Sequence, residues 1–101
     1  MVNKETIIAN LKEVYDPEIS VNIYDLGLIY NIEIDNDEDH VTITHTLTSA
    51  FCPYADMIVQ DISAAGYKNT NAKIVQVDTT FDPPFTMESV PLDTRAALGW
   101  L

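Results

Sequence analysis

The sequence predicts a small α/β (α+β) domain in the order helix–strand–strand–helix–strand, with a short C-terminal helix and a compact mixed sheet on which the helices pack. Apolar residues recur with a helical period over 3–15 and 53–65. They alternate with a period of two over 28–35, 40–48 and 73–81, as expected of strands with one buried face. Because the last strand follows a helix rather than a hairpin, its pairing should be parallel or mixed.

Length and composition limit the possible classes of protein. The 101 residues, 47% of them apolar, fit one folded domain spanning 1–101. A formal net charge of −11 repels phosphate backbones and anionic lipids, so nucleic acid and membrane are poor partners, whereas a cationic surface or a metal ion is a better one. The chain lacks a signal-peptide pattern and a membrane-spanning apolar run, and a single cysteine cannot form an internal disulfide. We therefore expect a cytoplasmic protein.

The first predicted helix covers 3–15, with Asn3 as its N-cap. One apolar stripe supports it: Ile7, Ile8, Leu11, Val14 and Tyr15. Pro17 should end it, because proline disfavours helical geometry in the residue before it. The turn Asp16-Pro17-Glu18 then carries two carboxylates, although Asp before Pro is also ordinary turn chemistry.

A hairpin is predicted next. Gly27 supplies a turn before the strand 28–35, and the acidic run Asn36–Asp39 joins that strand to 40–48. We interpret the acidic run as a solvated loop, since it lacks the spaced ligands and the glycine of a calcium loop.

In the second strand, His45 shares a face with Val41, Ile43 and Leu47. A histidine on such a face is most often a core side chain. It also lies on the strand that leads to the only cysteine, so we keep it as a second candidate metal ligand, because imidazole and thiolate commonly bind zinc, copper or iron together.

Cys52 is the strongest candidate for a reactive group. Pro53 suits the first position of a helix, which would make Cys52 the N-cap and Gly66 the C′ residue. At an N-cap, free backbone N–H groups and the helix dipole favour the thiolate, and with it nucleophilicity or metal affinity. The alternative is that Cys52 is a small buried apolar side chain.

After the third strand, Asp82-Pro83-Pro84-Phe85-Thr86 must be extended, and such stiff segments often form the rim of a site. A terminal helix over 91–98 should end at Gly99. Trp100 either packs on its own domain or contacts another subunit.

Four segments carry a family resemblance: Asp16–Glu18, Asp25–Tyr30, Thr46–Ser49 followed by Cys52-Pro53, and Asp82–Thr86. In this order and spacing they resemble the iron–sulfur cluster assembly domain family, the metal–sulfur cluster biosynthesis proteins of the PaaD/SufT type. The resemblance spans about residues 5 to 99, and the chain corresponds to a minimal version without the cysteine-rich extension of longer relatives. Ala50-Phe51 depart from the family pattern, which has Pro-Gly there.

The resemblance implies a role in maturing or delivering iron–sulfur clusters. It places Cys52 at the family's reactive cysteine and Asp16 and Glu18 at its acidic motif, with Thr48 and Ser49 in the cysteine-bearing motif. The implied cofactor is iron or an iron–sulfur cluster, held transiently. The implied partners are other assembly proteins and client apoproteins.

Ligand chemistry limits how such cargo is held. An iron–sulfur cluster is usually coordinated by four thiolates or nitrogen ligands in their place, and one chain can supply Cys52 and at most His45. A homodimer or a partner protein would have to complete the site, with Phe51, Phe85 and Trp100 near the contact.

Two alternatives stay open. One is an adapter whose thiol is incidental to its function. The other is a cysteine-dependent enzyme with Cys52 as nucleophile and His45 as base.

Overall fold

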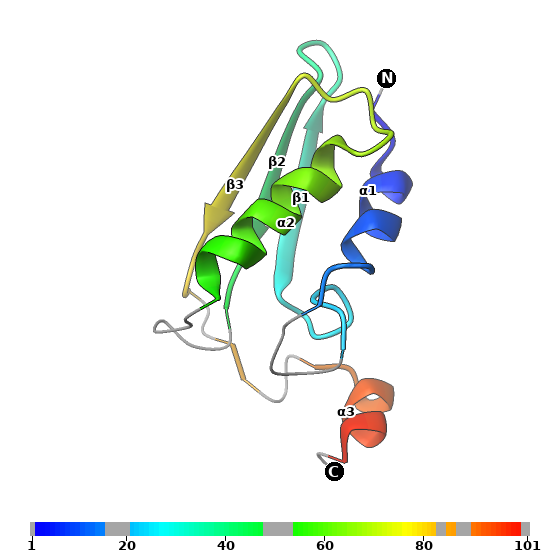
Figure 1. Ribbon diagram of the computed structural model, residues 1–101, viewed down its shortest axis with the longest axis vertical. Helices are drawn as coiled ribbons and strands as arrows, with labels where there is room; N and C mark the ends of the chain where they lie inside the picture. The colour runs from blue at the N-terminus through cyan, green and yellow to red at the C-terminus, as the bar shows by residue number, and fades with distance from the viewer. Residues whose placement is uncertain (1, 16–20, 48–53, 83–84, 87–89, 100–101) are drawn as a thin grey trace.

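The computed structural model describes residues 2–15, 21–47, 54–82, 85–86 and 90–99. Its elements confirm the predicted order: α1 (Lys4–Leu11), β1 (Ile29–Asp35), β2 (His40–His45), α2 (Ala55–Tyr67), β3 (Ile74–Thr79) and α3 (Leu92–Leu98). Helix α2 lies across the sheet with α1 beside it, and α3 stands at the opposite end of the molecule from the β1–β2 turn (Figure 1). The predicted α+β class is therefore confirmed.

The sheet has the order β1-β2-β3 and is mixed, as predicted. Strands β1 and β2 are antiparallel, whereas β2 and β3 are parallel, so that Ile43 lies opposite both Ile32 and Val77. The C-terminal ends of β2 and β3 and the N-terminal end of β1 therefore lie at the same end of the strands, which we call the site edge of the sheet. Helix α2 starts at this same edge (Figure 1).

The core lies between the sheet and the two long helices. The predicted inward face of β2 is confirmed, because Val41, Ile43 and His45 are fully buried. Ile58 and Ile62 of α2 pack onto this face as the helical periodicity predicted. Burying an aliphatic side chain of this size stabilises the fold by roughly 1.5–3 kcal/mol.

Helix α1 has the predicted N-cap, because the Asn3 side chain accepts a hydrogen bond from the backbone N–H of Glu5. It ends at Leu11, four residues before the predicted end. Beyond it, Tyr15 pairs with Asn22 in an isolated bridge, and the carbonyl of Val14 accepts from the N–H of Ile23 at 2.8 Å. The chain after Leu11 therefore turns to make extended pairing instead of a further helical turn.

The prediction for the start of α2 was wrong. The helix begins at Ala55 with Tyr54 as N-cap, so Cys52 and Pro53 precede it. Pro53 was read as the first helical residue, but proline suits extended and turn geometry as well as the first turn of a helix. The end of α2 also differs, because the helix continues through Gly66 to Tyr67.

Gly66 is a packing residue rather than a C′ residue. A Cβ atom added to it would lie 2.6 Å from Cγ1 of Val75, closer than two carbon atoms can approach. The missing side chain therefore lets α2 lie directly on β3. The predicted turn and cap glycines are confirmed elsewhere, since Gly27 and Gly99 have positive φ angles of 81° and 75°.

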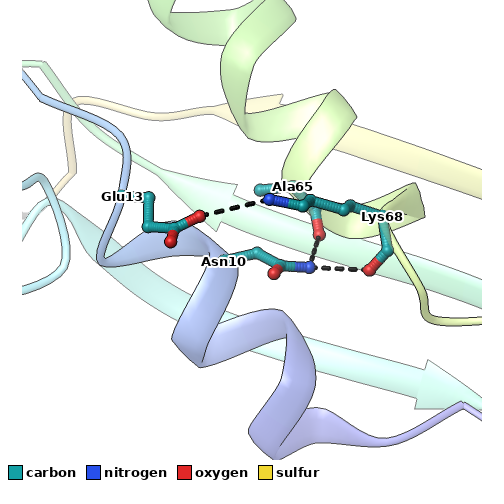
Figure 2. Close-up of polar contacts among 4 residues, drawn as sticks. All are labelled: Asn10, Glu13, Ala65 and Lys68. Atoms are coloured by element: carbon teal, nitrogen blue, oxygen red, sulfur yellow. Dashed lines mark hydrogen bonds and ion pairs between the residues drawn. The ribbon is translucent and has the colours of Figure 1, made fainter.

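The C-terminal end of α2 is fastened to α1 by Asn10 (Figure 2). Its side-chain amide donates to the carbonyls of Ala65 at 2.9 Å and of Lys68 at 2.8 Å. These are among the last carbonyls of a helix, which have no partner within the helix itself. Beside them, the Lys68 ammonium and the Glu13 carboxylate form an ion pair at 3.4 Å.

Candidate functional site

Most of the predicted site lies outside the described residues: Asp16, Glu18, Thr48, Ser49 and Cys52. The structure does describe the residues on either side of the segments 16–20 and 48–53. Segment 48–53 joins the end of β2 to the start of α2, both at the site edge of the sheet (Figure 1). Hydrogen bonds join the other flank to this edge: Thr46 N–H donates to Leu28 O at 2.8 Å, and Leu28 N–H to Ile23 O at 3.1 Å. Ile23 in turn pairs with Val14, just before the acidic segment 16–20.

His45 is the predicted site residue that the structure describes. It is fully buried, and both ring nitrogens have partners. Nδ1 lies 3.2 Å from the carbonyl oxygen of Thr46, and Nε2 lies 2.8 Å from the hydroxyl oxygen of Thr79. A carbonyl oxygen only accepts, so Nδ1 carries the proton and Nε2 accepts from the Thr79 hydroxyl. His45 therefore has the geometry of a core side chain rather than of a metal ligand. Binding a metal would require it to give up one of these hydrogen bonds.

The surroundings of His45 also favour its neutral form. Burial lowers its pKa below the usual value of 6.5 and outweighs the hydrogen bond to Thr46, which acts in the opposite direction. The ring therefore ties the parallel ends of β2 and β3 together as a neutral side chain.

Sequence reasoning missed two residues at this edge. Thr79 lies in the predicted strand 73–81 but was not singled out there, although it is the partner that fixes the His45 ring. Thr46 is fully buried, and its hydroxyl has no hydrogen-bond partner among the residues that the structure describes. Alternation along β2 assigned Thr46 to the wetter face, so the sequence held no signal for its burial.

The N-terminal end of α2 offers less to Cys52 than an N-cap would. Cys52 precedes the N-cap residue Tyr54 by two positions, and Asp56 already places a carboxylate in the first turn of the helix. The dipole argument for a thiolate at Cys52 thus loses its predicted basis.

Of the aromatic side chains predicted near a subunit contact, Phe51 and Trp100 lie outside the described residues. Phe85, the third of them, lies within the described residues. It is partly buried and packs against the core cluster.

In the part of the chain that the structure describes, no three His, Cys, Asp or Glu side chains are grouped closely enough to hold a metal ion. The acidic turn 36–39 belongs to this part. None of the described helices is long and apolar enough to cross a membrane.

The family model and the similar proteins all point to iron–sulfur cluster assembly. Residues 4–78 match the family model described as iron–sulfur cluster assembly protein. The chain is 42% identical to a protein of Porphyromonas gingivalis named Fe-S protein maturation auxiliary factor, over 97% of this chain and 92% of the relative. It is 40% identical to the Bacillus subtilis auxiliary factor YitW, over 95% of this chain and 93% of that one.

The fold is similar to a solved structure as well. The crystal structure of a DUF59 domain from Bacillus anthracis superposes with a TM-score of 0.85 at 34% identity, covering 95% of this chain and 91% of that domain. The family match covers most of the chain, including the hairpin, α2 and all but the last residue of β3. The protein belongs to the iron–sulfur cluster assembly protein family.

Proposed function

We propose that this protein helps to mature iron–sulfur proteins by delivering iron or a cluster, and that Cys52 is the group that holds this cargo. The observation that carries the proposal is the family membership, together with relatives named as maturation auxiliary factors. Cys52 is the only thiol of the chain and lies in the segment between β2 and α2.

The available ligands make the cargo transient. One chain supplies one thiolate, and both nitrogens of His45 are already hydrogen-bonded, whereas an ordinary cluster needs four strong ligands. A second copy or a partner protein would have to supply the remainder. Incomplete coordination within one chain suits a carrier, because the cargo can be surrendered to a client.

We further propose that Asp16, Glu18, Thr48 and Ser49 surround Cys52. The hydrogen bonds from Val14 through Ile23 and Leu28 to Thr46 support this, because Val14 and Thr46 lie two residues before Asp16 and Thr48. In this proposal the acidic and hydroxyl groups receive ferrous iron before or after Cys52 binds it, since these oxygen donors hold ferrous iron more weakly than thiolate does.

The proposed role is that of a non-catalytic, cytoplasmic factor acting on other assembly proteins and client apoproteins. An enzyme with Cys52 as nucleophile would need a nearby base. To serve as one, His45 would have to give up the hydrogen bond between Nε2 and the Thr79 hydroxyl, and its buried position makes this costly.

The test is anaerobic reconstitution of the wild type and Cys52→Ser side by side, with iron and sulfide content and sedimentation as readouts. We expect the wild type to bind iron and Cys52→Ser to lose nearly all of it. His45→Gln is the matched control and should keep wild-type iron content. Equal iron in Cys52→Ser would contradict the role of Cys52, and loss of iron in His45→Gln would make His45 a ligand.

A further inference from the structure

Two hollows on the surface share Tyr15 as a lining residue. The larger, about 490 Å³, lies between the end of α1 and the second half of α2, with Asn10, Glu13 and Asp61 among its lining residues. The smaller, about 330 Å³, lies between α3 and the turn at Val21–Asp25. Tyr15 lines both, and 54% of its surface is exposed. We call the two hollows together the Tyr15 groove.

The groove is held in a fixed shape. Asn10 fastens the end of α1 to the carbonyls of α2 (Figure 2). The backbone of Tyr15 pairs with Asn22, and the side chain of Asn22 accepts from the N–H of Asp25 at 2.8 Å while donating to its carboxylate at 2.9 Å. A surface that is ordered before binding loses little conformational entropy when a partner docks.

The charges along the groove are predominantly negative. Its lining cation, Lys68, is paired with Glu13 at 3.4 Å. The carboxylates of Asp61, Asp25 and Asp93 also line it, and none of them is ion-paired with any described residue. Apolar side chains such as Val14, Val21 and Ala65 lie between these charges.

We propose that the Tyr15 groove binds a segment of a partner protein that carries arginine side chains beside apolar ones. An arginine can stack on the exposed ring of Tyr15 while pairing with the neighbouring carboxylates, and exposed tyrosines with apolar surroundings often dominate binding at interfaces. A second copy of this chain is less complementary to this groove than a cationic segment, because its own net charge is also −11. The groove does not include Cys52, so the proposal holds whether or not Cys52 carries iron.

The experiment uses the ¹⁵N-labelled full chain and, as probe, an acetylated and amidated synthetic peptide of sequence Arg-Leu-Ala-Arg-Leu. We expect amide shifts centred on residues 10–15 and 61–68. Tyr15→Ala should weaken the affinity about tenfold, and Tyr15→Phe should retain it because the aromatic face remains. Asp61→Asn should weaken it about threefold, as expected of one exposed charge pair.

Matched controls separate docking from general attraction to an acidic protein. Tyr54→Ala removes another exposed tyrosine, and Asp37→Asn removes a carboxylate from the β1–β2 turn. Both should change the affinity by less than about twofold. Shifts centred on the turn, an equal effect of Asp37→Asn and Asp61→Asn, or no binding at millimolar peptide would overturn the proposal. A dimer that Tyr15→Ala dissociates would also overturn it, by making a second copy the occupant.

Cys52→Ser distinguishes this proposal from the proposed function. It should bind the peptide with wild-type affinity even if it has lost all iron. A lower peptide affinity in Cys52→Ser would show that binding at the groove depends on Cys52, and would contradict the proposal on this point.

Discussion

His45 shows how one buried, titratable side chain links the sheet to pH. In the unfolded chain the ring takes up a proton near pH 6.5, whereas burial lowers its pKa in the folded state. Below pH 6.5 the unfolded state therefore binds more protons, and the free energy of unfolding decreases as pH falls. The stabilising effect is fully present above pH 6.5 and is lost toward the folded-state pKa.

We expect this loss to reach at most about 1.4 kcal/mol per pH unit for one proton. Urea denaturation of the wild type and His45→Gln between about pH 7.5 and 5.5 measures it, and the difference between the two slopes isolates His45 from the carboxylates. Parallel slopes would show that protonation of His45 is not the cause.

Thr46 presents the opposite case, a buried polar group with no partner. Its hydroxyl is buried and makes no hydrogen bond with any of the described residues, so within this part of the chain its desolvation is not compensated. Thr46→Val keeps the branched shape and removes the hydroxyl. We expect it to stabilise the protein by about 1 kcal/mol in urea denaturation.

Thr42→Val on β2 is the control, since Thr42 is only half-buried and its hydroxyl can reach water. The prediction fails if Thr46→Val destabilises the protein more than Thr42→Val does. A variant that gains stability but loses iron in the reconstitution assay would mark the hydroxyl of Thr46 as part of the site rather than of the core.

Among the elements, α2 depends on α1 for its final turn. The Asn10 amide donates hydrogen bonds to the carbonyls of Ala65 and Lys68, which have no partner within α2. Both carbonyls lie far from Asn10 in the sequence. Asn10→Ala should therefore lower the free energy of unfolding by about 1–2 kcal/mol and increase amide exchange near Lys68.

The neighbouring ion pair provides the comparison. The side chains of Lys68 and Glu13 are 60% and 69% exposed, and pairs this open contribute little. Glu13→Gln should lower the free energy of unfolding by less than about 0.5 kcal/mol. If Glu13→Gln were as damaging as Asn10→Ala, the ion pair rather than the amide would hold the two helices together.

Taken as a whole, the molecule was predictable where the information is local. The alternation of Val41, Ile43 and His45 predicted the inward face of β2, and the helical spacing of Ile58 and Ile62 predicted the buried face of α2. Parallel pairing of β3 followed from the helix that precedes it. These features depend on periods of two and 3.6 residues, which a single sequence displays directly.

What could not be predicted depends on partners distant in sequence. Gly66 resembled a helix stop until Val75 of β3 explained its missing side chain. His45 remained ambiguous because the residue that fixes its ring, Thr79, lies 34 positions away. For the candidate site, the motif around Cys52 was readable, but the start of α2 at Ala55 was not, since proline marks a turn as readily as a first helical turn.

The parallel pairing of β2 with β3 has a consequence for how the chain folds. The β1–β2 hairpin closes through the short turn 36–39, an event of microseconds, whereas pairing of β3 with β2 must close the much longer segment that contains α2 and is therefore slower. Until then the outer edge of β2 has no neighbour. An unpaired strand edge invites strands from other chains, so newly made protein is most prone to aggregation in the interval before β3 docks.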